Sequence, residues 1–241
     1  MRRWRRMKFF IGVASLLLAG CGAVQIAPEP SLPRALVDPV AVEVGLLLTP
    51  EQRNFSHTET RAGVEWQVAL GAGHQLLARS VFGGLFGGLK EFNSLEDARA
   101  AQGLAVIMEP LIEQYSFATA RETGGEYVAV TIRYRINVFN PAGELHDELS
   151  LTGYGTSFAE GLGSGPPIEQ ATRSAMRDAA ARFLTQFRGL PLAEDLVAQR
   201  PLAALNSAES QAAAAARIEA VPIRVSRRVD PSWKPATTAS R

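Results

Sequence analysis

The sequence predicts an α+β fold, a single domain in which a largely antiparallel sheet has its helices packed on one face. Three stretches predict this class. Residues 128–138 alternate between apolar and polar side chains, as a strand covered on one side does. A turn and a second alternating stretch follow them, which predicts a β-hairpin. Residues 167–187 then carry apolar side chains three and four positions apart, the spacing of an amphipathic helix.

The first strand of the domain is predicted at Val40–Leu48, a stretch rich in Val and Leu that stops at Thr49-Pro50. A polar loop containing Asn54, Ser56 and His57 is expected next, followed by a short strand at residues 65–70.

A helix is predicted over residues 72–89 because Leu77, Val81, Leu85 and Leu89 recur at helical spacing. It contains a tandem repeat in which one phenylalanine, two glycines and one leucine occur twice: Phe82, Gly83, Gly84, Leu85, Phe86, Gly87, Gly88 and Leu89. Glycine costs roughly 1 kcal/mol relative to alanine inside a helix, so the repeat needs a compensating role. Three readings are open: close packing on another backbone, contact with a partner or a membrane, and a helix that ends near Gly83 with a loop after it.

A further strand is predicted at residues 104–117, where Pro110 indicates an edge, a bulge or a break. The hairpin follows, with its turn at Asn140–Gly143 and a return strand that extends to Thr156.

The closing helix is predicted from Pro167 to Phe187, and Gly189 can end it. Alanines on its apolar side would let it lie close to the sheet. One stripe collects its apolar positions: Ile168, Ala171, Ala175, Ala179, Phe183 and Phe187. Residues 41–190 thus form the α+β domain, 191–220 a helical extension that includes an alanine-rich helix, and 221–241 a basic tail expected to be disordered.

The N-terminus carries a signal peptide over residues 1–20. Five basic residues precede an uncharged apolar run from Phe9 to Ala19, which is too short to span a bilayer, since a spanning helix needs ~20 residues. The run ends in Leu18-Ala19-Gly20-Cys21, which resembles the lipobox of bacterial lipoproteins, so Cys21 is the expected site of acylation. Translation can start at Met1 or Met7 with the same mature product. Residues 21–40 contain four prolines and are expected to tether the domain to the lipid.

The cysteine count and the distribution of charge limit the kinds of cross-link and partner that the protein can have. Cys21 is the only cysteine, which excludes an internal disulfide. After removal of the signal peptide, the chain up to Ala216 has 14 basic and 22 acidic residues, whereas the remaining tail has 6 basic and 2 acidic ones. An acidic domain argues against nucleic acid as a partner.

No catalytic or metal-binding pattern is present in the sequence. His57, His74 and His146 are far apart and lack metal-ligand spacing, and no nucleophile elbow or phosphate-binding loop occurs. Asp147 and Glu148 are adjacent on a predicted strand, so they point to opposite faces. The sequence therefore predicts a protein that is not an enzyme and needs neither a cofactor nor a metal.

Two arginines form a candidate anionic-ligand face. Arg133 and Arg135 are two residues apart on the clearest strand and share its polar side. They could bind a lipid headgroup or a glycan, or they could pair with acidic residues on neighbouring strands.

Three features together resemble the YajG-type lipoproteins of the bacterial envelope. These are the lipobox ending at Cys21, the strand pair 127–132 and 149–154, and the closing helix from Ile168 to Phe187. The resemblance covers residues 100–190 best, and the layout is more loosely similar to envelope assembly factors and secretion-ring subunits. The phenylalanine–glycine repeat and the basic tail depart from this pattern.

The resemblance implies a protein held by palmitate-type acyl chains on the periplasmic side of the cell envelope. Gly22 follows the cysteine, where an aspartate would favour the inner membrane, so the outer membrane is expected. A non-catalytic accessory or assembly subunit is the first functional expectation, with an envelope protein as its partner and homo-oligomers allowed. The alternative is a binding module for lipid, glycan or peptidoglycan. The candidate partner or membrane contact is Phe82, Gly83, Gly84, Phe86, Gly87 and Gly88.

Overall fold

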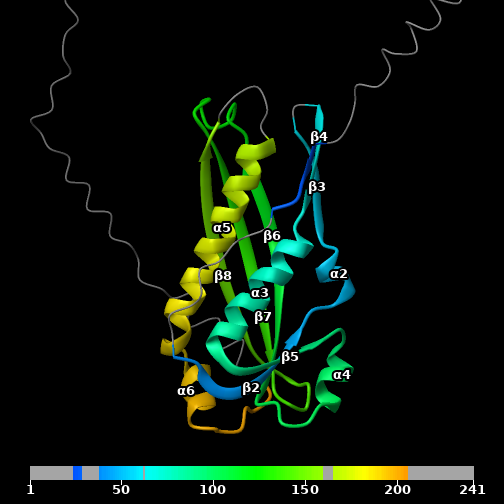
Figure 1. Ribbon diagram of the computed structural model, residues 1–241, viewed down its shortest axis with the longest axis vertical. Coiled ribbons are helices and arrows are strands. Elements are labelled where there is room, and N and C mark those ends of the chain that lie inside the picture. Colours follow the sequence, from blue (N-terminus) through cyan, green and yellow to red (C-terminus); the bar gives the residue numbers. More distant parts are fainter. Residues whose placement is uncertain (1–23, 29–37, 62, 160–164, 206–241) are drawn as a thin grey trace, which may run out of the picture. The chain divides into compact units, whose positions relative to one another are not determined.

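The computed structural model describes residues 24–28, 38–61, 63–159 and 165–205 (Figure 1). The expected signal peptide, Cys21, the alanine-rich helix near residues 208–220 and the basic tail lie outside these ranges. The compact unit of the chain extends to Ala204.

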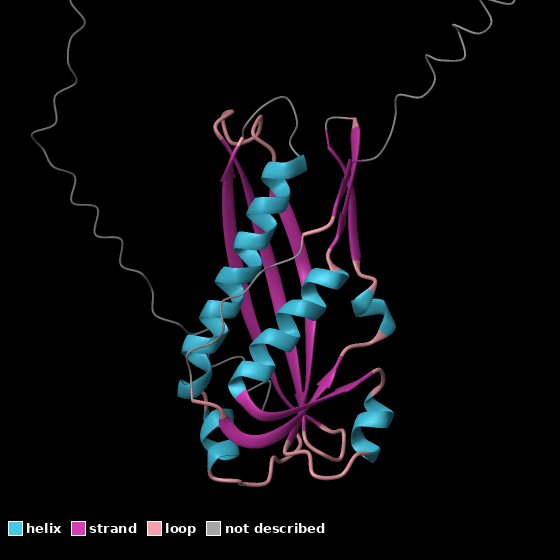
Figure 2. Ribbon diagram, viewed as in Figure 1, coloured by secondary structure: helices cyan, strands magenta, loops and turns pink. Residues whose placement is uncertain are grey.

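Two sheets and several helices make up this unit, and the α+β class is confirmed (Figure 2). The larger sheet has the strand order β5-β2-β6-β7-β8 and the smaller one the order β1-β4-β3. The strands are β1 (Val24–Ile26), β2 (Val40–Leu47), β3 (Ser56–Arg61), β4 (Val64–Ala69), β5 (Phe86–Phe92), β6 (Val106–Ala118), β7 (Tyr127–Phe139) and β8 (Leu145–Phe158). The helices are α2 (Pro50–Arg53), α3 (Gly71–Leu85), α4 (Leu95–Ala100), α5 (Gly165–Gln186), a 3-10 turn (Phe187–Gly189) and α6 (Pro191–Val197).

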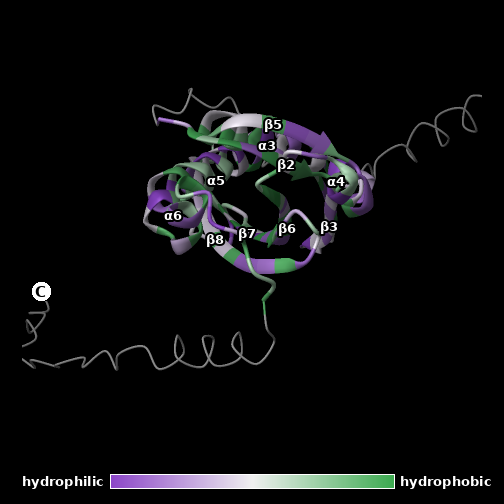
Figure 3. Cartoon of the chain, turned by 90° about the horizontal axis from the view of Figure 1, so that it is seen from below, coloured by the Kyte–Doolittle hydropathy of each residue, from purple (hydrophilic) through white to green (hydrophobic). Residues whose placement is uncertain are grey.

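The predicted hairpin is confirmed and forms the long antiparallel half of the larger sheet. Residues of β7 alternate between buried and more exposed positions along most of the strand, and the buried set is the apolar set of the sequence. Hydrophobic (green) and hydrophilic (purple) residues both occur along the strands, because successive side chains point to opposite faces of the sheet (Figure 3). The other half of this sheet is parallel, since β2 pairs in parallel with both β5 and β6. The sheet is therefore mixed, and only β6, β7 and β8 have the predicted antiparallel arrangement.

Pro110 lies at a position of β6 that has a strand neighbour on one side only, so the backbone N–H that proline lacks is not needed for pairing on the other side. The pairing of β6 with β2 ends at Met108, whereas the pairing with β7 continues through Pro110 opposite Ile136. Of the three readings of this proline, the edge position is the one observed, because β6 has become an edge strand on the side of β2 at that point.

The closing helix is confirmed as α5, and its apolar stripe is buried against the sheet. Two glycines of β8 allow a very close approach. A Cβ atom added to Gly153 would lie 2.1 Å from the carbonyl oxygen of Ala175, and one added to Gly155 would lie 2.0 Å from that of Ala171. A buried hydrogen bond of 2.8 Å between Tyr115 of β6 and Thr172 also joins α5 to the sheet.

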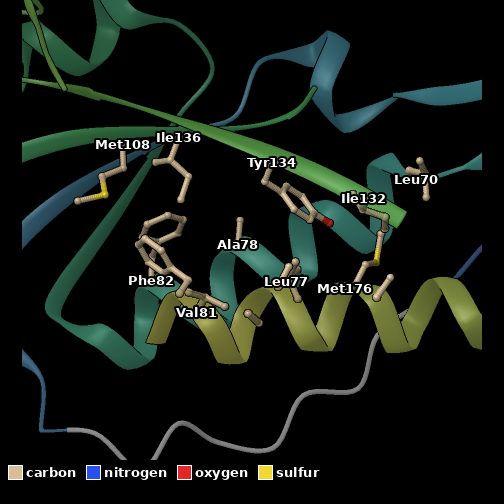
Figure 4. Packing of buried hydrophobic residues seen from close by; sticks show 14 of the residues in the cluster. Leu70, Leu77, Ala78, Val81, Phe82, Met108, Ile132, Tyr134, Ile136 and Met176 are labelled. Atoms are coloured by element: carbon tan, nitrogen blue, oxygen red, sulfur yellow. The ribbon is translucent and has the colours of Figure 1, made fainter. Parts of the chain in front are cut away.

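The helix predicted over residues 72–89 is shorter than expected. It ends at Leu85, and the second half of the repeat forms the start of β5, which pairs with β2. The side chains of α3 fill the space between β7 and α5 (Figure 4). Its buried residues and those packed around them are Leu70, Leu77, Ala78, Val81, Phe82, Met108, Ile132, Tyr134, Ile136 and Met176.

The opposite face of the larger sheet is also covered in part. A small second cluster of buried residues joins Leu47 and Ile107 to Ala98 of α4. Both strand residues alternate with members of the main core, so they point to the other face. Helices α3 and α5 thus share one face, as predicted, and the short α4 covers the β2 end of the other.

Three segments are more ordered than the sequence indicated. Val24–Ile26, placed in the tether, pairs in parallel with β4, and Ile26 is buried because it alternates into the core. The polar loop after Thr49 instead forms α2 and β3, with a capping box between Thr49 and Gln52 that starts the helix. Residues 191–202, assigned to the extension, contribute buried residues to the domain: Leu192, Ala193, Leu196 and Leu202.

Candidate functional site

The outer face of β7 places Arg133 and Arg135 side by side with acidic partners. The Nε atom of Arg133 lies 2.9 Å from a carboxylate oxygen of Glu113 on β6. A guanidinium nitrogen of Arg135 lies 3.8 Å from Glu148 on β8. The structure thus shows the pairing that the sequence left open, and an anionic ligand would have to compete with these carboxylates.

The same face continues as a row of polar contacts toward α2. Glu109 accepts one hydrogen bond of 3.0 Å from the side chain of Gln52 and another of 2.8 Å from that of Asn137. Three carboxylates therefore lie on the same face as the two arginines, which argues against this face as a site for an anionic ligand.

The phenylalanine–glycine segment is folded into the core. Phe82 and Phe86 are 2% and 3% exposed. Their rings stack on each other at a centroid distance of 6.3 Å, and they pack on Phe183 and Phe187 at 5.6 and 5.4 Å respectively. In this conformation the two rings are not available to a partner or a membrane, because they supply packing instead. Gly83 and Gly87 are the exposed positions of the candidate contact, whereas Gly84 and Gly88 are half-buried.

One of the three histidines weighed in the sequence, His74, is buried on α3. His74 is 2% exposed, its ring stacks on that of Tyr134, and its Nε2–H donates to the carbonyl oxygen of Pro110 at 2.9 Å. Among the residues that the structure describes, neither the Nδ1 atom of His74 nor the Tyr134 hydroxyl has a hydrogen-bond partner. Both residues line a cavity of about 30 Å³ between the sheet and helices α3 and α5. Burial lowers the pKa of His74 to about 4 and raises that of the Tyr134 hydroxyl.

This histidine makes the stability of the fold depend on pH. The ordinary pKa of 6.5 applies in the unfolded chain and about 4 in the folded one, so the unfolded state binds the proton first as the pH falls. The contribution is fully present above pH 6.5 and is lost as the pH falls through this window, up to about 3 kcal/mol. We expect urea titrations between pH 7 and pH 4 to show a steeper loss of stability for the wild type than for His74→Gln. Parallel pH profiles of the two proteins would contradict this prediction.

The other two histidines and the carboxylate pair do not converge on a site. His57 lies beside Glu59 at 3.6 Å, and Nδ1 of His146 lies 2.5 Å from the carbonyl oxygen of Ala203. Asp147 accepts a hydrogen bond from the backbone N–H of Glu148. No cluster of potential metal ligands occurs among the residues that the structure describes.

Two hollows lie along the N-terminal half of β2. The larger, of about 690 Å³, lies between this strand, the β7–β8 turn and residues 199–202; the smaller, of about 430 Å³, lies between the strand and α6. Ala41, Val42, Leu196 and Gln199 line both hollows, so the two meet along one strand. We call them together the β2 groove. No pattern in the sequence predicts the β2 groove, because its residues come from four separate segments.

The backbone at the β2 groove has two unusual features. Pairing of β2 with β6 begins only at Val44, so residues 40–42 have no strand neighbour on that side within the described chain. Gln199, at the end of α6, has a φ angle of 52°, and it is the only residue other than glycine with a positive φ in the described ranges. Such a conformation costs roughly 1 kcal/mol or more for a side chain of this kind.

Within the described residues, no helix combines the length and apolar character needed to cross a bilayer. Cys21, the predicted acylation site, precedes the first described residue, Val24, by three positions.

Among the comparisons with known proteins, only the comparison of backbone structures found similar proteins. No protein-family model and no curated protein matches the chain. A neuraminyllactose-binding hemagglutinin homologue from Helicobacter pylori is similar with a TM-score of 0.42 and 8% identity, over 66% of this chain and 91% of the other. A lipoprotein from Caulobacter crescentus has a TM-score of 0.30 and 12% identity, over 39% and 75% of the two chains. The lipoprotein GNA1162 from Neisseria meningitidis has a TM-score of 0.30 and 9% identity, over 63% and 100%.

Proposed function

We propose that the protein is a non-catalytic lipoprotein, acylated on Cys21 and held on the periplasmic face of the outer membrane, which acts by binding another envelope protein. The observation that carries this proposal is the position of the first strand. β1 begins three residues after the lipobox cysteine and is part of the folded unit, so the attachment point and the fold are joined by a very short segment.

The anchor rests on the sequence of the signal peptide and on the number of acyl chains. A single acyl chain binds a membrane only marginally, whereas two or more hold a protein stably. The mature lipoproteins that this N-terminus resembles carry several chains on the cysteine, which is sufficient for stable attachment. Gly22 after the cysteine supports the outer membrane in preference to the inner one.

The partner contact is placed at the β2 groove. Figure 1 shows β2 and α6 at one end of the described fold and β1 with β4 at the other. The groove thus lies away from the attachment point, where another protein can reach it. On the β6 side of β2, residues 40–42 have no strand neighbour among the described residues, and an extended segment of a partner can add to such an edge as a further strand. An extended peptide segment of an envelope protein is therefore the proposed occupant.

A matched pair of substitutions tests this contact. Ala142 is exposed in the β7–β8 turn and lines the larger hollow, so the bulk of Ala142→Trp is expected to obstruct part of it. Ala72→Trp places the same side chain on an exposed position of α3, which does not line the groove. After cross-linking in intact cells and detergent extraction, we expect a defined partner to be recovered with the wild type and with Ala72→Trp. Recovery should be lost with Ala142→Trp.

Two results would contradict the proposed contact. Equal recovery with all three proteins would place the partner elsewhere on the molecule. Absence of any defined partner, with a glycan or peptidoglycan fragment bound in a manner that Ala142→Trp blocks, would favour a ligand-binding module over an assembly subunit.

A further inference from the structure

The fold carries exposed apolar side chains at the end where the chain arrives from Cys21. Seven large apolar residues are exposed among the described positions: Val64, Leu76, Tyr127, Tyr154, Phe158, Val197 and Leu205. Four of them belong to the β3–β4 hairpin and to the halves of β7 and β8 nearest this end. Single exposed apolar residues are common and need no explanation, so their position relative to the attachment point is the informative feature.

Covalent geometry limits how far Cys21 can lie from this end. Only Gly22 and Ala23 separate it from Val24, and three extended residues span at most about 11 Å. Val24 is fixed in register opposite Trp66 of β4. Its side chain lies beside Gly165, where a Cβ atom would be 3.6 Å away. The cysteine is therefore tied closely to the start of α5 and to β4.

The ends of several other elements meet at the same place. Arg61 of the β3–β4 hairpin forms an ion pair of 2.7 Å with Glu122 in the β6–β7 turn. The backbone N–H of Ala159, just after β8, donates to the carbonyl oxygen of Glu126 in that turn. Figure 1 shows these turns together with the start of β1 at the upper end of the fold.

Phe158 is the most exposed of the apolar residues at this end. It is 77% exposed and lies opposite Tyr127, which is 40% exposed, in the register of β8 and β7. Phe158 also lines a hollow with Pro166 and Pro167 at the start of α5, directly after the Gly165 that contacts Val24. Val64, also 40% exposed, lies near the tip of the neighbouring hairpin. Two aromatic residues and a valine are thus exposed at the end of the fold where the acylated segment enters.

We propose that this end, formed by Val64, Tyr127 and Phe158, rests on the lipid surface and fixes the orientation of the protein on its membrane. The inference rests on the proposed acylation of Cys21, which would hold this end within a few residues of the lipid. Tyr127 has an apolar ring and a polar hydroxyl and so favours the interface between hydrocarbon and water, whereas the side chains of Phe158 and Val64 are wholly apolar and favour the hydrocarbon itself. The charges in these turns include Arg61 and Arg121 against Glu65, Glu122 and Glu126, so basic residues are not in excess and attraction to anionic lipid is not the source of the contact.

Fluorescence quenching in reconstituted vesicles tests the orientation. The full mature, acylated protein is placed in phosphatidylcholine vesicles with and without brominated acyl chains, as wild type, Phe158→Trp and Val197→Trp. Val197 is 69% exposed on α6 at the opposite end, so the second variant is a matched control. The wild type supplies the signal of Trp66 and Trp233, which all three proteins share.

We expect the added tryptophan of Phe158→Trp to be blue-shifted and to lose emission in brominated vesicles, while that of Val197→Trp does neither. The loss should be equal in vesicles that contain phosphatidylglycerol, because the contact is apolar. Lack of quenching at position 158, equal quenching at both positions, or quenching at 158 only with anionic lipid would overturn the inference.

The mass of the same preparations separates this inference from the proposed anchor. Acylated protein that remains on the vesicles without quenching at position 158 overturns the orientation alone. Protein that lacks acyl chains and stays off the vesicles overturns the anchor and, with it, the orientation.

Discussion

Replacement of Phe82 by alanine is expected to lower the free energy of unfolding by about 4 kcal/mol. The ring is 2% exposed and packs on Phe86 and Phe183 at centroid distances of 6.3 and 5.6 Å. It also lines the cavity of about 30 Å³ beside His74, so its removal would enlarge a space that is already incompletely filled. The substitution therefore combines the loss of buried apolar surface with a cavity that the surroundings cannot close.

Urea unfolding followed by far-ultraviolet circular dichroism measures this loss. Leu76→Ala on the same helix is the control, because Leu76 is 44% exposed and its truncation should cost less than about 1 kcal/mol. The comparison also decides between the open roles of the phenylalanine–glycine repeat. A Phe82→Ala protein with wild-type stability that has lost a partner or its membrane contact would show that the segment acts as a contact surface outside the core.

Replacement of Gly155 by alanine is the second substitution with a large expected effect, about 3 kcal/mol or more of lost stability. The added Cβ would lie 2.0 Å from the carbonyl oxygen of Ala171 and 2.5 Å from the backbone nitrogen of Ala175. Both atoms belong to the backbone of α5, so no rotation of a side chain can relieve the clash. The helix would have to move away from β8 along its buried stripe.

Gly189→Ala is the matched control for this substitution. Within the described part of the chain, no heavy atom outside the neighbouring residues lies within 4 Å of the Cβ position at Gly189. A change there should alter stability by no more than about 0.5 kcal/mol. Equal urea midpoints for Gly155→Ala and Gly189→Ala would mean that α5 does not lie as close to the sheet as the structure shows.

The sequence predicted the elements whose side chains repeat with a clear period. Alternation along 128–138 and the stripe from Ile168 to Phe187 each identified a face that the structure buries. The parallel pairing of β2 was not predicted, because a short continuous apolar stretch such as 40–48 carries no period from which a neighbour or a direction can be inferred.

The prediction that the helix continues to residue 89 was wrong for a related reason. Leu85 and Leu89 fit a helical spacing, yet Gly87 and Gly88 have low helix propensity and lie against β2, where tertiary pairing decides the conformation. β1 was missed because Val24 and Ile26 form too short an alternation to be recognised.

The candidate surfaces were only partly predictable. The shared face of Arg133 and Arg135 followed from their spacing, but their carboxylate partners depend on the register of β6 and β8. The β2 groove and the apolar end near Val24 combine residues that are distant in the sequence, so only the folded chain reveals them.

The attachment through Cys21 is the central claim, and intact mass combined with membrane fractionation tests it most directly. The wild-type protein is expected to have the mass of the chain from Cys21 onward increased by acyl chains, and to sediment with the outer membrane. The Cys21→Ala protein should lack this increment and lose the membrane association. A soluble wild-type protein without acyl chains would contradict the anchor and the arrangement proposed around it.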